Sequence, residues 1–374
     1  MRIAINTRFL LKDKLEGVGW FTYEIAKRLV KNHPQDTFFF LFDRPYEADF
    51  VFAANVHPLV LSPPARHPVL FYIWFEYAVA RALKRHKIDL FLSPDNFCSL
   101  RTKVPTVLVV HDLAYAHFPD QLRKRDLWYY RYFMPKFIQQ AAQIVTVSNY
   151  TKSDILERHP IATSKISVAC NGCRPSFKPV SLAVRESIRA EYSEGKEYFF
   201  YVGAVHPRKN VHRLIAAFDQ FKQQTKSDTQ LLIAGRFSWQ TGAVKTAYDL
   251  AKYQAAIHFL GYVSDDLLPQ LMGSALAITY ISTFEGFGVP LLEAMHCEVP
   301  IITANVSSMP EVAGEAALLV DPFQVDAIAA AMCTLQADKQ IRENLVARAK
   351  SQRKLFSWES AAQVVYEACE KVCV

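Results

Sequence analysis

The sequence predicts an α/β protein with two doubly wound parallel sheets. Short apolar runs rich in β-branched and aromatic residues alternate with helical stretches along the chain, which is the pattern of βαβ units. The runs form two series, one ending with Q-I-V-T-V at 143–147 and one beginning with Y-F-F-Y-V-G at 198–203. A proline-marked connection separates the series, and 374 residues suffice for two domains. We therefore predict domains at 1–178 and 179–356 and a terminal helix at 357–374.

Composition indicates a globular protein of a reducing compartment. Hydrophobic residues make up 51% and charged residues 21% of the chain, which is typical of domains with sizeable cores. Arg8 stands where a signal peptide would have its apolar centre, so we expect a first strand there. The seven cysteines predict no disulfide framework and favour the cytoplasm. Cys170 and Cys173 form a C-x-x-C without a second pair, so a loop is favoured over metal or redox work.

The net charge of +7 is concentrated in the first half. Residues 1–178 hold 25 Lys and Arg against 15 Asp and Glu, and the remainder holds 18 against 21. Two stretches, 67–87 and 123–137, interleave aromatic and basic residues at helical spacing. Helices packed on a sheet explain this pattern best, and contact with the cytoplasmic face of a membrane stays open. Nucleic-acid binding is not expected, because no recognised binding motif accompanies the charge.

The strongest candidate site is S-T-F-E-G-F-G-V-P-L-L-E-A-M-H-C at 282–297. Its glycines and Pro290 predict that Glu285 lies in a loop and that Glu293 lies inside the following helix. The N–H groups of such a helix N-terminus suit a diphosphate, and the two carboxylates would accept hydrogen bonds from hydroxyls on either side of it. The alternative is that both acids only complement the helix dipole, which explains a buried Glu293 poorly.

E-G-F-G-V-P-L-L-E-A-M resembles the E-x7-E signature of retaining glycosyltransferases of family 4. The resemblance runs from the first strand to the last helix. It implies the GT-B fold, in which two Rossmann-like domains face a central cleft and the C-terminal helix crosses back to the first domain. It also implies an acceptor-binding first domain and a second domain that binds a nucleotide-sugar donor.

The resemblance assigns roles within the second domain. Glu285 would contact the hexose and Glu293 the ribose, with backbone contacts from 286–288. Arg208 and Lys209 would bind the diphosphate as part of P-R-K-N, a variant found in bacterial polysaccharide mannosyl- and hexosyltransferases. His206 stands where that variant often has Glu. The backbone positions implied at the donor are Gly203, Gly235, Val263, Gly286, Phe287 and Gly288.

Three further segments match the family. Gly17 and Gly19 are expected in a loop between the first strand and the first helix, facing the cleft. His111 would contact the donor sugar or diphosphate, and Asp112 would shape its loop. Helix-capping groups are expected from their positions before helices and are Ser148, Thr151, Ser307, Ser308 and Glu311.

The chain contains no D-x-D triplet, so we expect no metal and no cofactor. The resemblance implies hexosyl transfer from an NDP-sugar, with GDP-mannose as the first expectation, to a glycan or lipid-linked glycan. The resemblance also implies retention by front-face substitution, and the lack of an evident nucleophile is consistent with it. Two alternatives stay open: a GT-B sugar-nucleotide epimerase or hydrolase, and a non-catalytic nucleotide-sugar binding protein.

Overall fold

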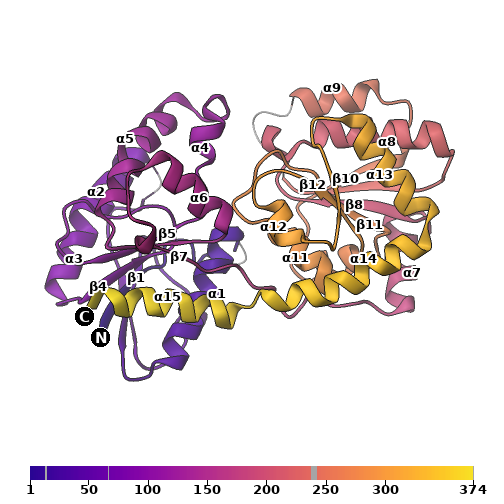
Figure 1. Cartoon of the computed structure of the whole chain (residues 1–374). Helices are drawn as coiled ribbons and strands as arrows, with labels where there is room; N and C mark the ends of the chain where they lie inside the picture. Colours follow the sequence, from indigo (N-terminus) through magenta and orange to yellow (C-terminus); the bar gives the residue numbers. More distant parts are fainter. Residues whose placement is uncertain (13–14, 66, 237–241, 374) are drawn as a thin grey trace. The chain divides into compact units, whose positions relative to one another are not determined.

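The computed structural model describes residues 1–12, 15–65, 67–236 and 242–373. The chain divides into two units, Met1–Asn171 with Ser357–Val374 and Gly172–Phe356 (Figure 1). The first unit thus ends before residue 178, where we placed the boundary. The segment from Ser357 onward groups with the first unit.

Unit 1 contains a parallel sheet with the strand order β3-β2-β1-β4-β5-β6-β7 among its described residues. The apolar runs of the sequence form the strands, and β2 is buried along nearly its whole length, as expected for a parallel sheet covered on both faces. The order reverses between β1 and β4. The strands are β1 (Arg2–Asn6), β2 (Thr37–Phe42), β3 (Val56–Val60), β4 (Leu90–Ser93), β5 (Thr106–Val110), β6 (Gln143–Thr146) and β7 (Ile166–Val168).

The helices of unit 1 cover this sheet and include both aromatic and basic stretches. Trp74 and Phe75 of the first stretch are buried, as packing on a sheet predicts. Trp128 and Tyr132 of the second are 62% and 48% exposed. The helices are α1 (Gly17–Asn32), α2 (Pro68–Ile73), a π-helical turn (Trp74–Val79), α3 (Ala80–Arg85), α4 (Ala114–His117), α5 (Lys124–Gln140), α6 (Asn149–Arg158) and α15 (Trp358–Cys373).

Helix α1 begins earlier than predicted. Gly17 and Gly19 lie in its first turn, so their placement in a loop ahead of the helix is wrong. A Cβ built on Gly19 would lie 2.9 Å from the Phe9 carbonyl oxygen. The helix start therefore packs against the segment that follows β1, and the absence of a side chain at Gly19 permits that approach.

The C-terminal helix α15 is anchored in unit 1, as the family resemblance implies. Its Trp358 ring lies edge-on to Phe21 of α1, with ring centroids 6.1 Å apart. The Tyr366 hydroxyl donates to Asp36 Oδ2 at 2.7 Å, and the Tyr366 ring stacks on His33 at 3.4 Å. Both of these partners follow α1, so α15 holds the end of that helix as well as its side.

Unit 2 contains a second parallel sheet, whose described strands follow the order β10-β9-β8-β11-β12-β13. The prediction of two doubly wound sheets is therefore confirmed. The order reverses between β8 and β11, and ligands of such sheets bind outside the carboxyl ends of the strands at this switch point. The strands are β8 (Tyr198–Val202), β9 (Gln230–Ala234), β10 (Ile257–Gly261), β11 (Ala277–Tyr280), β12 (Ile301–Ala304) and β13 (Leu318–Val320).

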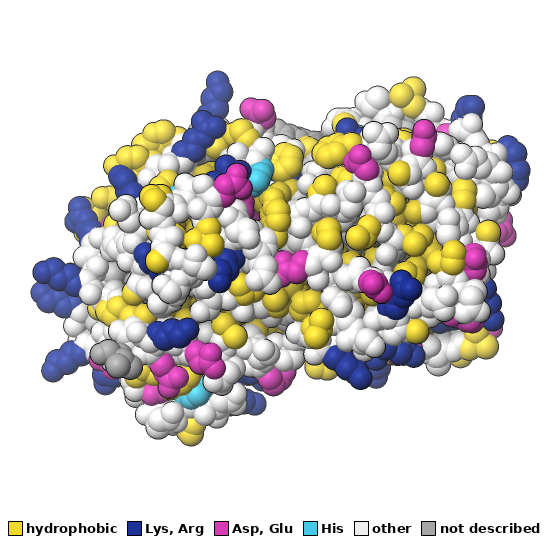
Figure 2. Space-filling view, viewed as in Figure 1, with side chains coloured by type: hydrophobic (Ala, Val, Ile, Leu, Met, Phe, Trp, Pro, Cys, Tyr) yellow, Lys and Arg dark blue, Asp and Glu magenta, His cyan; other side chains and the backbone are white. Residues whose placement is uncertain are grey.

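The helices of unit 2 pack on its sheet through an apolar core that includes Phe199, Phe218 and Met332. They are α7 (Leu182–Ser193), α8 (Val211–Thr225), α9 (Gly242–Leu250), α10 (Leu268–Ser274), α11 (Val289–His296), α12 (Met309–Ala313), α13 (Val325–Ala337) and α14 (Lys339–Gln352). None of the helices in the described ranges of either unit has the length and apolar character needed to cross a membrane. On the face drawn in Figure 2, hydrophobic side chains are interspersed with charged ones.

We expect the Tyr366–Asp36 hydrogen bond to contribute measurably to the free energy of unfolding of unit 1. Tyr366→Phe removes the buried hydroxyl and should lower the free energy of unfolding by about 1–2 kcal/mol. Tyr366→Ala also removes the stacked ring and should cost about 3–5 kcal/mol. Urea denaturation followed by circular dichroism measures both, with the exposed Gln363→Ala on the same helix as the control. Equal midpoints for wild type and Tyr366→Ala would contradict this anchoring.

Candidate functional site

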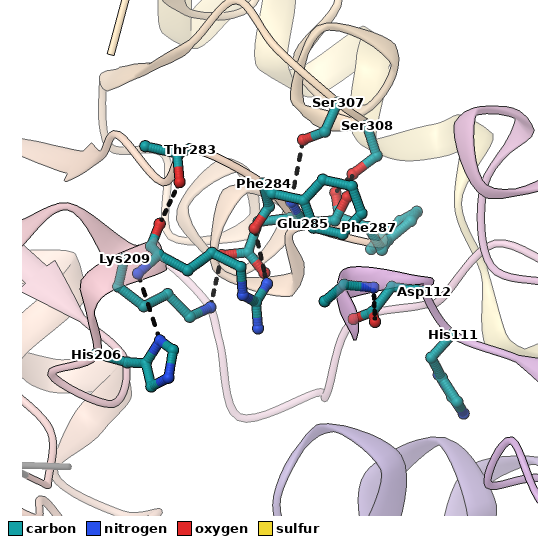
Figure 3. Close-up of polar contacts among 12 residues, drawn as sticks. His111, Asp112, His206, Lys209, Thr283, Phe284, Glu285, Phe287, Ser307 and Ser308 are labelled. Carbon is teal, nitrogen blue, oxygen red and sulfur yellow. Dashed lines mark hydrogen bonds and ion pairs between the residues drawn. The ribbon is translucent and has the colours of Figure 1, made fainter. Parts of the chain in front are cut away.

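Two basic side chains and one carboxylate meet at the switch point of unit 2 (Figure 3). Lys209 Nζ lies 2.6 Å from Glu285 Oε1, and Arg208 Nη1 lies 3.3 Å from Glu285 Oε2. Glu285 is only 7% exposed. The cations follow β8 and the carboxylate follows β11, so the strand order brings together residues that are far apart in the sequence.

The local backbone fixes both cations ahead of helix α8. Residues Pro207–Lys209 form a 3-10 turn, and Asn210 follows it in the left-handed conformation with φ 61°. The buried Asn210 amide donates to the Ile281 carbonyl at 3.1 Å and to the Pro322 carbonyl at 2.6 Å. The turn therefore cannot shift without breaking buried hydrogen bonds. His206 accepts from the Arg208 backbone N–H through Nδ1 at 3.3 Å, which gives it a role in shaping this turn.

Lys209 and Arg208 set the charge state of Glu285. Burial opposes ionisation of Glu285, but Lys209 and Arg208 outweigh it and lower the pKa of the carboxyl to about 2. The carboxylate is therefore ionised at neutral pH beside two cations. Basic side chains held at the carboxyl ends of the strands suit an anionic ligand. Direct pairing of Glu285 with the two cations was not predicted from the sequence.

Ser307 and Ser308 hold the Glu285 loop, and our prediction that they cap a helix is wrong. Helix α12 has no side-chain cap bond from Ser308 at its N-terminus. The Ser308 hydroxyl instead lies 2.9 Å from the carbonyl oxygens of both Glu285 and Phe287. The Ser307 hydroxyl accepts from the Glu285 N–H at 3.0 Å. A buried loop between β11 and α11 must satisfy its backbone groups, and these two serines bond to several of them.

Glu293 lies in α11 and is buried, as predicted. Gly288, with φ 100°, and Pro290 begin this helix. Arg174 Nη2 lies 3.2 Å from Glu293 Oε1, and Arg174 Nη1 lies 2.6 Å from Asp265 Oδ1. Burial raises the pKa of Glu293, while Arg174 acts in the opposite direction. No pattern in the sequence pointed to Arg174 as the partner of Glu293, so this pair was missed.

Glycines bring three strand ends of unit 2 close together. Gly203 and Gly235 have φ values of 145° and 147°. A Cβ on Gly235 would lie 1.8 Å from the Gly203 carbonyl oxygen, and the Gly235 N–H donates to the Gly261 carbonyl at 2.7 Å. Val263 lies half-buried just beyond β10. The family resemblance also implies that segment 234–239 lines the nucleotide base, and from residue 237 onward this segment lies outside the described residues.

His111 and Asp112 belong to unit 1 and follow β5. His111 Nε2 lies 2.8 Å from the Pro94 carbonyl oxygen, its ring lies edge-on to Phe21, and burial lowers its pKa. Asp112 accepts from the Ala114 N–H at 2.9 Å and so shapes the start of α4. The imidazole is held neutral and fixed in orientation.

Helix α6 in the same unit begins as predicted. Ser148 accepts from the Thr151 N–H at 3.0 Å. The Thr151 hydroxyl donates to the His111 carbonyl at 3.2 Å, so this residue supports the His111 loop besides lying in the first turn. Cys170 and Cys173 lie in an irregular segment and form no disulfide in the described part of the chain.

Comparisons with known proteins cover both units. The family model described as Glycosyltransferase Family 4 matches residues 15–177, and the model described as Glycosyl transferases group 1 matches residues 184–352. O-antigen chain mannosyltransferase B of Escherichia coli is 29% identical over 366 residues, which cover 94% of each chain. O-antigen chain mannosyltransferase RfbU of Salmonella typhimurium is 27% identical over 259 residues, covering 68% of this chain and 67% of that one.

Solved structures share the whole architecture. The crystal structure of WaaG, a glycosyltransferase involved in lipopolysaccharide biosynthesis, matches with a TM-score of 0.78 at 16% identity and covers 99% of both chains. Anabaena HepE in complex with UDP-glucose matches with a TM-score of 0.77 at 18% identity, over 99% of this chain and 100% of that one. The chain therefore belongs to glycosyltransferase family 4 and is a glycosyltransferase with the GT-B fold.

Proposed function

We propose that this glycosyltransferase moves a hexosyl group, with retention and without a metal, from an NDP-sugar to a glycan or lipid-linked glycan in surface-polysaccharide synthesis. The observation that carries the proposal is the position of Arg208 and Lys209 beside Glu285, where the segments after β8 and β11 meet. A diphosphate is an anion that basic side chains at such a strand edge bind. The mannosyltransferase names of the relatives support GDP-mannose as the first donor to test.

In the proposed reaction the bond between the anomeric carbon and the diphosphate breaks, and a bond to the acceptor oxygen forms on the same face. Arg208 and Lys209 stabilise the charge that develops on the departing diphosphate, the role that a metal has in other transferases. The acceptor proton passes to a diphosphate oxygen, which needs no protein nucleophile. Glu285 remains ionised and orients the hexose through its hydroxyls, and Glu293 accepts from the ribose.

An acceptor carried on lipid would require contact with the cytoplasmic face of a membrane. Exposed side chains of α5 support this part of the proposal: Trp128 and Tyr132 stack with ring centroids 5.4 Å apart, and Lys136 Nζ lies 3.3 Å from the Tyr132 ring centroid. Aromatic side chains beside cations suit the interface between lipid headgroups and water.

Thermal denaturation with a panel of nucleotides and nucleotide sugars tests the donor. A nucleoside diphosphate at about 100 times its dissociation constant should stabilise the folded protein by roughly 2.7 kcal/mol. The shift should be the same with and without EDTA, because protein cations take the place of a metal. Loss of the shift in EDTA would contradict the metal-independent part.

An activity assay separates the two alternatives. Product formed without any acceptor would favour an epimerase or hydrolase, and binding without turnover would favour a binding protein.

Lys209→Ala should slow transfer far more than it perturbs folding. Loss of one preorganised cation at the leaving group should lower kcat by about 10²–10³-fold. Steady-state kinetics measures the effect, circular dichroism checks that the variant is folded, and the exposed Lys252→Ala is the control. A folded Lys209→Ala enzyme with unaltered turnover would remove this residue from the site.

Glu293→Gln should weaken nucleotide binding while keeping the shape of the side chain. The neutral amide accepts a weaker hydrogen bond from a ribose hydroxyl, so the dissociation constant for GDP should rise about tenfold. Binding of pyrophosphate, which has no ribose, should change little. Isothermal titration calorimetry measures both ligands, with Glu315→Gln, 85% exposed at its side chain, as the control. Full GDP affinity in Glu293→Gln would refute the ribose assignment.

A further inference from the structure

The last residues of unit 2 contact the Glu285 loop and the C-terminal ends of the helices α11 and α12. Helix α14 ends at Gln352, a 3-10 turn follows at Arg353–Leu355, and Phe356 is the last residue of the unit. We call Gln352–Phe356 the terminal strut. Leu355 is 70% exposed, whereas Phe356 is 9% exposed. The strut therefore has one side chain directed into unit 2 next to one directed to solvent.

The buried side chain of the strut contacts the Glu285 loop directly. The Phe356 ring meets the Phe287 ring edge to face, with centroids 5.6 Å apart and an interplanar angle of 83°. Phe287 is 4% exposed and lies two residues after Glu285. Aromatic pairs in this geometry attract each other beyond the burial of their surfaces. Phe356 therefore limits how far the Glu285 loop can move.

Arg353 holds the far end of α11. Its Nη1 donates to the carbonyls of Met295 at 3.0 Å and His296 at 3.3 Å. These carbonyls belong to the last turn of the helix, where a positive charge also complements the helix dipole. Glu298 accepts from Arg353 Nη2 at 3.4 Å and keeps the guanidinium at this position.

Gln352 holds the far end of α12 in the same manner. Its Nε2 donates to the Val312 carbonyl at 3.1 Å and to the Glu311 carbonyl at 3.4 Å. A Cβ built on Gly314, which follows the helix, would lie 2.8 Å from the Gln352 side chain. The amide is therefore closely packed against the helix end that it satisfies.

The N-terminal ends of both helices held by the strut contact the Glu285 loop. Gly288 is the N-terminal cap of α11, and Ser308, which precedes α12, bonds to the Glu285 carbonyl. We propose that the terminal strut is a positioning element for donor binding, acting on the Glu285 loop through Phe287 and through α11 and α12. This inference rests on the proposed donor site, because it assigns the strut a role in that same function.

Amide hydrogen exchange tests the positioning without any substrate. Phe356→Ala should speed exchange of the 285–288 amides about threefold to tenfold, the factor that corresponds to an aromatic pair. Arg353→Met should have an effect in the same direction through α11. The matched controls, Leu355→Ala and Lys354→Met, change exposed neighbours in the same segment and should leave exchange unaltered.

Donor kinetics then separates positioning from general stability. Phe356→Ala should raise the KM for the nucleotide sugar about threefold to tenfold and leave the acceptor KM unchanged. Phe356→Met keeps an apolar side chain that contacts the Phe287 ring and should restore most of the affinity. Leu335 lies in α13 and is buried in the core of unit 2. Leu335→Ala should lower the melting temperature at least as much as Phe356→Ala does, without changing the donor KM.

The outcomes distinguish the inference from the proposed function. Unaltered amide exchange at 285–288 in both Phe356→Ala and Arg353→Met would refute the proposed positioning role of the strut, whatever ligand the protein binds. An equal rise in donor KM for Leu335→Ala would also overturn it, because stability alone would then explain the effect. If the wild-type protein binds no nucleotide sugar but Phe356→Ala still speeds amide exchange at 285–288, the proposed function is refuted. The positioning of the Glu285 loop by the strut is then still supported.

Discussion

The buried carboxylate of Glu285 is the constraint on which the site depends. Desolvation opposes ionisation of this group, and Lys209 and Arg208 make the largest contributions that hold it ionised. Their positions are fixed by the buried amide of Asn210, and the loop on the other side is fixed by Ser308. The cluster therefore places two cations and one ionised carboxylate together at the edge where such sheets bind ligands.

The second sheet supplies the geometry for this cluster. The strand order reverses between β8 and β11, so the segments that follow these strands meet at one edge. Gly235 lets its backbone approach the Gly203 carbonyl oxygen to a distance that a Cβ would prevent. Ion pairs and closely packed strand ends thus occur together at the edge where a phosphate-bearing ligand is expected to bind.

Much of this arrangement could be predicted from the chain alone, and the failures share one cause. The alternation of apolar runs and helices predicted both sheets, and Pro290 with its flanking glycines predicted where Glu293 lies. The start of α1 was misplaced because the fit of Gly19 against Phe9 is a tertiary contact. Ser308 was taken for a cap because it precedes a helix. Its hydroxyl instead bonds to the loop of Glu285, 23 residues earlier in the chain, and no local pattern connects the two.

Most helices and strands, and the family, could be recognised from the chain, because periodicity, turn residues and motif spacing are local properties. Which charges meet depends on the folded structure. Lys209 and Glu285 are 76 residues apart, and Arg174 and Glu293 are 119 apart, so their pairing depends on how the strands are ordered and where the helices begin. Hydrogen bonds and ion pairs act over a few ångströms, and folding alone brings such distant residues within that range.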